Sequence, residues 1–395
     1  MSTLKVLNVG QGDSSILSIE KGCLYNEHDI YIDLGNGQYD VSQAGAPLHN
    51  KILILSHAHQ DHIGGLLFFI NSLGHKNGLK EIWMPLFFEE ISLITDKILN
   101  LRGIQNVSYI NGAFLSAKNT VSAFHLLHKL SKSTSIKMIG IYEGRRSCNH
   151  FDFFHPLLDP ETILGLTEKE ITEYINKLEK SNFAEIRQWF SEPYAQELIN
   201  ILERHRFRDG IEHLFFNNLE ISNFSSLRTR FSYGLLLKLR ESIVKFVEKP
   251  SDSSFIAIFN VLKKSSNDCS IVFKFIKNKL DVLFTGDISK KILTYLTIKH
   301  SLTATVLKIP HHGSKHNLNK KTLKLINPTY AIISHGNKKF GRQSDPHPNK
   351  EIIEMLESLN VSTLYTNDVI KNEKILIKKP SNINFGPHIE YFDKY

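Results

Sequence analysis

The chain has 395 residues, of which 41% are hydrophobic and 22% charged, and its net charge at pH 7 is +8. This composition is typical of a folded globular protein and excludes collagen, a disordered chain and a disulfide scaffold. The three cysteines (Cys23, Cys148 and Cys269) are too far apart in the sequence to indicate a disulfide framework or a cysteine-rich zinc site. We therefore expect a reducing, cytoplasmic compartment, and the mild positive charge alone says little about partners.

Neither a membrane span nor a signal peptide is visible in the sequence. The apolar run at 63–70 is far shorter than the roughly 20 residues that a bilayer requires. The N-terminus carries one lysine and reaches Asp13 without a long apolar segment. We expect no membrane association.

Strand patterns and helix patterns alternate in the first part of the chain. The predicted strands are 4–9, 15–19, 30–34, 51–55 and 79–85, with a helix over 64–73 before the last of them. The run at 51–55 is apolar throughout, as in strands that are buried on both faces. This order of elements predicts a layered α/β core.

Helical periodicity dominates from residue 87 to 250, and strand patterns return afterwards. The middle contains predicted helices at 167–190, 191–211 and 235–247 and one strand at 136–142. Further strands are predicted at 255–262, 270–276, 280–285, 304–309, 330–334, 363–365 and 374–377, with helices from 288, at 320–325 and at 350–359. We predict two core halves, 1–86 and 251–380, separated by a mainly helical insertion at 87–250 and followed by a tail at 381–395.

Four potential metal ligands follow the buried strand at 51–55. They are His57, His59, Asp61 and His62. Side chains at the carboxyl end of a strand in an α/β sheet are well placed to form a site. Imidazole and carboxylate ligands suit zinc, manganese or iron. A chance cluster of histidines in a surface loop is a poor alternative, because this spacing directly after such a strand is improbable.

Two later strands end in similar residues. The run Leu283-Phe-Thr-Gly-Asp287 ends in a glycine that permits a tight turn and a carboxylate that can bridge two cations. The run Leu307-Lys-Ile-Pro-His311-His312 ends in a histidine pair. Asp287 alone would be weak evidence for a metal site. It becomes stronger evidence because the ends of one strand before it and one strand after it in the sequence carry histidines.

With these segments, the sequence resembles the metallo-β-lactamase superfamily, and within it the metallo-hydrolase domain of ComEC-like DNA-uptake proteins. The resemblance covers roughly residues 1–85 and 251–350 and leaves out the helical middle. The matching segments are Asn8-Val-Gly-Gln-Gly-Asp13, Tyr31-Ile-Asp33-Leu-Gly35, His57 to Gly65, Asn267-Asp-Cys-Ser270, Phe284-Thr-Gly-Asp287, Pro310-His-His-Gly-Ser314 and Pro328 to Asn337.

The resemblance implies an αββα sandwich with a two-metal site at the rim between its sheets. His57 and His59 would hold one ion, Asp61 and His62 the other, and Asp287 would bridge them. His312, or else His311, would complete the second site. Asp33 would orient the histidine loop from behind.

A third histidine for the first ion, common in the superfamily, has no recognisable motif here. His150 and His155 are the least implausible candidates, although a core or surface role is the better interpretation of both. We therefore expect two divalent ions, Zn²⁺ or Mn²⁺, or a single ion if the first site is incomplete.

Such a site predicts hydrolysis by a metal-activated hydroxide. We take Asp61, Asp33 and His347 as the catalytic residues, with His347 a candidate proton donor in a segment that departs from the family pattern. Lys308, Ser314, Lys315 and Asn337 are the predicted substrate-binding residues.

A basic stretch next to the predicted ligands favours a nucleic-acid substrate. It runs from Lys308 to Arg342 without an acidic residue and also contains Lys315, Lys320, Lys321, Lys324, Lys338 and Lys339. Such residues attract phosphate backbones, although a merely solvated basic face is the plain alternative.

The leading hypothesis is therefore a phosphodiesterase or nuclease acting on DNA or RNA. Hydrolysis of a small substrate (a cyclic nucleotide, phosphocholine ester, lactone or thioester) remains an alternative, because a fold does not fix a function. A non-enzymatic protein with a structural site is a third. The helical insertion could act as a lid, a substrate-binding arm or a docking surface for a protein partner.

Overall fold

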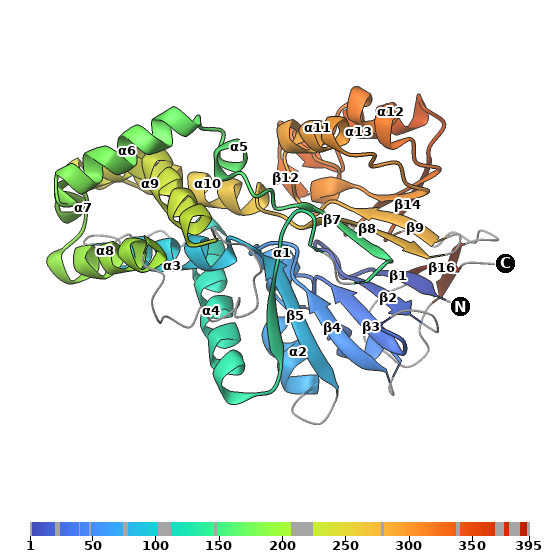
Figure 1. Cartoon of the computed structure of the whole chain (residues 1–395). Helices are drawn as coiled ribbons and strands as arrows, with labels where there is room; N and C mark the ends of the chain where they lie inside the picture. The colour runs from blue at the N-terminus through green and yellow to red at the C-terminus, as the bar shows by residue number, and fades with distance from the viewer. Residues whose placement is uncertain are drawn as a thin grey trace.

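The computed structural model has two β-sheets with helices on their outer faces and a helical group at one side (Figure 1). It describes residues 2–19, 24–38, 40–46, 49–73, 78–101, 112–145, 148–206, 224–277, 280–336, 340–367, 375–378 and 388–392. Both sheets combine parallel and antiparallel strands. The α/β class predicted from the sequence is confirmed.

The first sheet is built mainly from the N-terminal part of the chain. Its strand order is β15 (Ile375–Lys378), β16 (His388–Phe392), β1 (Thr3–Leu7), β2 (Ser15–Ile19), β3 (His28–Ile32), β4 (Asn50–Ile54), β5 (Leu79–Pro85) and β6 (Lys137–Ile141). Neighbours from β15 to β3 pair antiparallel, and those from β3 to β6 pair parallel. The segment 381–395, expected to be a tail, thus supplies β16, which pairs with β1.

The second sheet is built mainly from the C-terminal part. Its order is β14 (Ser362–Tyr365), β11 (Tyr330–Ile333), β10 (Val306–Lys308), β9 (Leu280–Phe284), β8 (Val272–Lys277) and β7 (Phe151–His155). The strands from β14 to β9 are parallel, whereas β8 pairs antiparallel with both β9 and β7. A separate hairpin joins β12 (Phe340–Arg342) to β13 (Asp345–His347).

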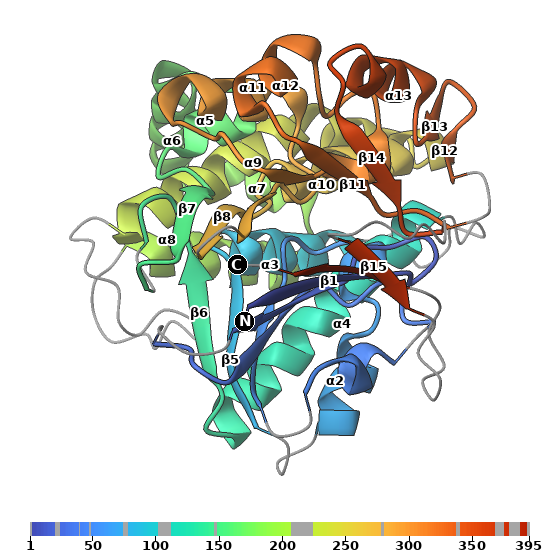
Figure 2. The same ribbon diagram turned by 90° about the vertical axis from the view of Figure 1, so that its right-hand side faces the viewer.

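The two sheets pack face to face around a shared apolar core. Alternate residues of the first sheet, such as Ile30, Ile52 and Trp83, belong to one buried cluster with Phe273 and Val282 of the second. Figure 2 shows helices beyond each sheet. These are α2 (Leu66–Leu73) and α4 (Gly112–Ser133) beyond the first, and α11 (Lys290–Lys299), α12 (Lys320–Ile326) and α13 (Lys350–Glu357) beyond the second. The result is a four-layer arrangement of helices, two sheets and helices.

Most helices of the middle of the chain lie to one side of the sheets, at the left of Figure 1. They are α3 (Phe88–Leu99), α5 (Pro160–Leu164), α6 (Glu168–Lys180), α7 (Ala184–Trp189), α8 (Glu192–Arg206), α9 (Phe224–Glu248) and α10 (Asp252–Asn267). No helix in the described ranges combines the length and apolar character needed to cross a bilayer. β6 and β7 come from this same part of the chain, so each sheet takes one strand from it.

The strand predicted at 255–262 is wrong, because this segment lies within helix α10. Its buried residues are Phe255, Ile258, Phe259 and Leu262, which follow helical spacing. Ser251 caps the helix by accepting a hydrogen bond from the amide of Ser254. A nearly continuous apolar run hid this periodicity, and the serine that caps the helix was not recognised as a helix start.

Candidate metal centre

The predicted ligands meet where strands of both sheets end. His57 follows β4 of the first sheet, whereas Asp287 follows β9 and His312 follows β10 of the second. His59 is the N-cap residue of the short helix α1 (Gln60–Ile63), and His62 lies within it. Because β4, β9 and β10 belong to the parallel parts of their sheets, their carboxyl ends bring these side chains to one rim.

Two groups of side chains share Asp287. One contains His57, His59 and Asp287, and the other contains His62, Asp287, His312 and Asp13. Within each group the candidate ligand atoms lie within 4.8 Å of one another. The two oxygens of Asp287 face different histidines, at 3.5 Å from Nε2 of His57 and 3.3 Å from Nε2 of His62. Asp287 is therefore placed to bridge two ions.

The turn after β9 depends on Gly286. Its φ of +51° is a left-handed conformation, and a Cβ atom there would lie 2.8 Å from Cβ of Ser270. Ser270 in turn accepts a hydrogen bond through Oγ from the amide of Asp287, at 3.1 Å. Only glycine fits this turn without displacing the carboxylate that both groups share.

Hydrogen bonds fix how the histidines of the second group are oriented. Nδ1 of His62 lies 2.7 Å from Oδ2 of Asp33, and Asp33 also accepts hydrogen bonds from the amide and hydroxyl of Ser56. Nδ1 of His312 lies 2.9 Å from the carbonyl oxygen of Ser334. With each Nδ1 engaged as a donor, each Nε2 is directed to the centre as a potential ligand.

Burial and neighbouring charges shift the pKa values of these groups. Desolvation by burial lowers the pKa of His57, and it lowers the pKa of His59 well below its usual range. Burial also disfavours a charged His62, but the carboxylates of Asp287 and Asp33 outweigh it and hold its pKa well above the usual value. Burial disfavours ionised Asp287 too, yet the surrounding imidazoles hold its pKa well below its usual range. Asp287 is thus ionised and His57 and His59 are neutral near pH 7, which are the states that bind metals, whereas His62 releases a proton when a cation binds.

The donor atoms fit a metal ion. Nε2 of His57, His59 and His62 and both carboxylate oxygens of Asp287 are buried and have no hydrogen-bond partner among the described residues. Buried polar atoms left unsatisfied are costly, so such a convergence needs an explanation. Imidazole nitrogens and carboxylate oxygens together are a ligand set for Zn²⁺ or Mn²⁺, and cations bound to the two groups would satisfy these atoms.

Two helices hold the loop that carries His57 and His59. The carbonyl oxygen of Ala58, between the two histidines, accepts a hydrogen bond from Oγ1 of Thr120 on α4, at 2.5 Å. The amide of Ala58 donates to Oγ of Ser266 on α10, at 3.3 Å. The peptide groups on both sides of Ala58 are thus fixed by helices that lie far away in the sequence.

Replacing Asp33 by asparagine should weaken metal binding about 10- to 100-fold, because the charged partner of His62 is lost. Asparagine tolerates the left-handed backbone of Asp33 (φ 59°), so the fold should persist. Metal titration with a competing chelator would measure the affinity, and circular dichroism would check the fold. An unchanged affinity would show that Asp33 does not support the ligand set.

Replacing Thr120 by valine should weaken metal binding by several-fold to about tenfold. Valine keeps the shape but leaves the buried carbonyl of Ala58 without its donor, and a lost buried hydrogen bond costs about 1–3 kcal/mol. Thr120→Ser is the matched control, because it keeps the hydroxyl and should bind metal nearly as the parent does. Equal metal affinities of the valine and serine variants would contradict this interpretation.

Three other predicted residues lie at the same centre. Nε2 of His311 lies 3.5 Å from Asp287, although His311 belongs to neither ligand group. Oδ2 of Asp61 lies 3.2 Å from Nε2 of His312. The ring of His347 on β13 contacts that of His311 edge to face, with centroids 4.8 Å apart, and lies 3.4 Å from Asp345. Their roles as ligands or proton donor stay predictions.

The predicted substrate-binding residues are dispersed. Lys308 is buried, and its Nζ forms an ion pair with Asp13 at 2.5 Å, whereas the prediction was a contact with substrate. Ser314 is buried and donates a hydrogen bond to Asp345. Lys315 is half-buried, with its ammonium 3.7 Å from Glu351. Asn337 lies outside the described residues, as do Lys338 and Lys339.

Neither candidate for an additional histidine joins a ligand group. Nδ1 of His150 lies 2.8 Å from the carbonyl oxygen of Ile276, on the edge of the second sheet. His155 is fully buried, with Nδ1 2.7 Å from the carbonyl oxygen of Ser270, and burial lowers its pKa to about 4. In the described part of the chain, the first group has two histidines and Asp287.

Asp13 was missed as a candidate ligand in the sequence, although it ends one of the matching segments. It lies beside His62, Asp287 and His312. Burial alone would raise its pKa, but the Lys308 ammonium and nearby imidazoles outweigh burial and lower the pKa of Asp13 to about 2. The signal that could have found it is Gly10-Gln-Gly-Asp13, a turn with a carboxylate directly after the first strand.

Comparison with known proteins gives one limited similarity. No family model matches the chain. A stretch of 103 residues, 26% of the chain, is 29% identical to ComE operon protein 3 of Bacillus subtilis (strain 168). The matched region spans 13% of that protein's length. The similarity is limited to this stretch, and the buried His/Asp groups are the feature of this chain that could hold metal ions.

Proposed function

We propose that this chain is a metal-dependent phosphodiesterase of the metallo-β-lactamase type that acts on DNA or RNA. The observation that carries the proposal is the pair of ligand groups sharing Asp287, with unsatisfied imidazole nitrogens directed to one centre. The four layers and the limited similarity to ComE operon protein 3 support the family. In this proposal residues 1–86 and 251–380 form the hydrolase core, and 87–250 are an insertion.

In this proposal the residues form two sets of ligands for two adjacent ions. His57, His59 and Asp287 would hold one, and His62, His312 and Asp287, with Asp61 or Asp13, the other. Bound there, the ions would supply a hydroxide at neutral pH, since a metal lowers the pKa of its water to about 7, and would neutralise charge on the phosphate. Asp33 keeps His62 in the tautomer that presents Nε2. Burial lowers the pKa of His347 to about 4, so we propose that His347, beside His311, donates a proton to the leaving oxygen only when the negative charge of a bound phosphate raises that pKa.

The charge of the chain segment that follows Asp287 supports an anionic substrate. No acidic residue occurs from Ile288 to Ser344, a segment that includes β10, α11 and α12. Lys320, Lys321 and Lys324 are exposed on α12. A surface of this kind attracts phosphates without reading base sequence.

Activity assays with Mn²⁺ or Zn²⁺ test the proposal. The substrates are plasmid, single-stranded DNA, RNA and bis(p-nitrophenyl) phosphate, beside a lactone and a thioester. We expect metal-dependent cleavage of the phosphodiesters, abolished in His59→Ala. Turnover of the lactone or thioester alone would refute the phosphodiesterase proposal and favour a small-substrate hydrolase.

A further inference from the structure

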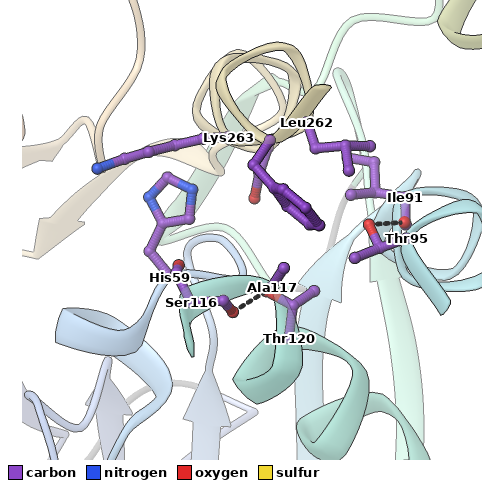
Figure 3. Close-up of a pocket in the computed structure, with 10 residues that line it drawn as sticks. His59, Ile91, Thr95, Ser116, Ala117, Thr120, Leu262 and Lys263 are labelled. Carbon is purple, nitrogen blue, oxygen red and sulfur yellow. Dashed lines mark hydrogen bonds between the residues drawn. The ribbon is translucent and has the colours of Figure 1, made fainter. Parts of the chain in front are cut away.

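A recess opens on the His59 side of the candidate metal centre, between three helices of the middle of the chain. Ile91 and Thr95 of α3, Ser116, Ala117 and Thr120 of α4, and Phe259, Leu262, Lys263 and Ser266 of α10 line it together with His59. Figure 3 shows His59 and Lys263 on the same side of this recess, with Leu262 and Ile91 on the other.

Lys263 places a positive charge at a centre built to bind cations. Its side chain is exposed and extends from α10 beside the His59 ring (Figure 3). Among the residues that the structure describes, no carboxylate lies within 4.0 Å of its ammonium. Lys308, on the other side of the centre, is instead buried and paired with Asp13. Lys263 is thus a lysine beside the centre whose charge is available to a ligand.

The charge of Lys263 is unfavourable beside bound metal ions unless an anion lies between them. A phosphate group attacked at the centre carries negative charge on its non-bridging oxygens. The ammonium of a flexible lysine is suited to bind such an oxygen as a point charge. Apart from Lys263 and the candidate ligand His59, the walls of the recess are hydroxyl and apolar side chains without a charge, so they would not compete for the anion.

The recess itself is too small to read a base. Its cavity volume is about 30 Å³, which is room for little more than a water molecule. Thr120 and Ser266, the hydroxyl residues nearest the His57–His59 loop, are engaged with Ala58. On this side of the centre, the protein would therefore recognise the charge of the substrate rather than the shape or the hydrogen-bond pattern of a base.

We propose that Lys263 is a substrate-binding residue that holds a non-bridging phosphate oxygen on the His59 side of the metal centre, irrespective of base sequence. This assignment rests on the proposed phosphodiesterase function and deepens it. It also gives α10 a direct part in substrate binding, in addition to holding Ala58 through Ser266.

Substitutions on one exposed helix face test the proposal. Lys263→Met removes the charge, Lys263→Arg keeps it, and Lys264→Met is the matched control, because Lys264 is an exposed neighbour outside the recess. For bis(p-nitrophenyl) phosphate, kcat/KM should fall about tenfold or more in Lys263→Met, as expected when a hydrogen bond to a charged group is lost. Lys263→Arg should retain most activity, and Lys264→Met should match the parent.

Binding without turnover supplies a second readout. In EDTA, the affinity for a fluorescein-labelled single-stranded oligonucleotide is measured by anisotropy across a salt series. The slope of log K against log salt should become shallower by about one in Lys263→Met, to the same extent for different base sequences, and should not change in Lys264→Met. Unchanged metal content in Lys263→Met would show that the centre is intact.

The outcomes separate the two proposals. If the parent protein cleaves phosphodiesters and Lys263→Met matches Lys264→Met in activity and salt slope, Lys263 is not a phosphate ligand and the proposed function stands. If the parent cleaves no phosphodiester, the proposed function fails. An unchanged salt slope in Lys263→Met would in that case overturn the assignment of Lys263 as well.

Discussion

Replacing Asp287 by asparagine is expected to abolish metal-dependent hydrolysis, with a loss of at least about 100-fold. Changes to residues that merely support metal ligands already cost 10- to 100-fold, and Asp287 belongs to both ligand groups. The amide is nearly isosteric but cannot supply two anionic oxygens, so both ions lose their shared ligand. The loss should appear in kcat/KM and in bound metal measured by elemental analysis.

Asp152→Asn is the matched control for this substitution. Asp152 is exposed on β7 of the same sheet and lies in neither ligand group. Its variant should retain the activity and metal content of the parent. If Asp287→Asn also retained both, Asp287 would not be a metal ligand.

Replacing Arg228 by methionine should lower the free energy of unfolding by about 3–5 kcal/mol. Arg228 of α9 is fully buried and pairs with Glu89 and Glu90 of α3. Without the guanidinium, two carboxylates stay in the interior with no countercharge. Urea denaturation followed by circular dichroism would measure the change. Arg230→Met is the control on the same helix: Arg230 pairs with Glu161 while partly exposed, so its loss should cost at most about 1 kcal/mol.

The destabilisation by Arg228→Met should be smaller at acidic than at basic pH. Burial raises the pKa of Glu90 to about 7 even though Arg228 opposes the shift, so without Arg228 the pKa rises further. A carboxyl group whose pKa is raised by folding stabilises the fold below its unfolded value, near 4.5, and this contribution is lost as pH rises through the folded value. A destabilisation of the same size at pH 5 and pH 8 would contradict an uncompensated Glu90.

The strands and the candidate ligands of the rim could be predicted from the sequence because each is indicated by a short run of neighbouring residues. The predicted strand at 51–55 and β4 nearly coincide, and the His57 and Asp287 turns follow their strands directly. β16 was missed because its role depends on pairing with β1, at the other end of the chain. α10 was predicted as a strand because its apolar residues also extend onto its exposed face, as at Ile256.

The parts of the site that sequence reasoning missed are those that depend on tertiary contacts. Nothing local to Lys308 indicates that it is buried against Asp13, and nothing local to Thr120 indicates that it holds Ala58. Lys263 likewise lies in an ordinary amphipathic helix, and only the packing of α10 brings it beside His59. Motifs can thus indicate candidate ligands of such a centre, whereas the residues that would support those ligands can be found only once the fold is known.

Metal binding by the parent protein tests the central claim most directly. After removal of metals with EDTA and equilibration with Zn²⁺ or Mn²⁺, elemental analysis should find at least about one ion per chain. Free metal at about 100 times Kd should add about 2.7 kcal/mol to the stability, seen as a rise in Tm that Asp287→Asn does not show. A parent protein that holds no metal after this treatment, with the same Tm in EDTA and in metal, would contradict a metal centre at this rim.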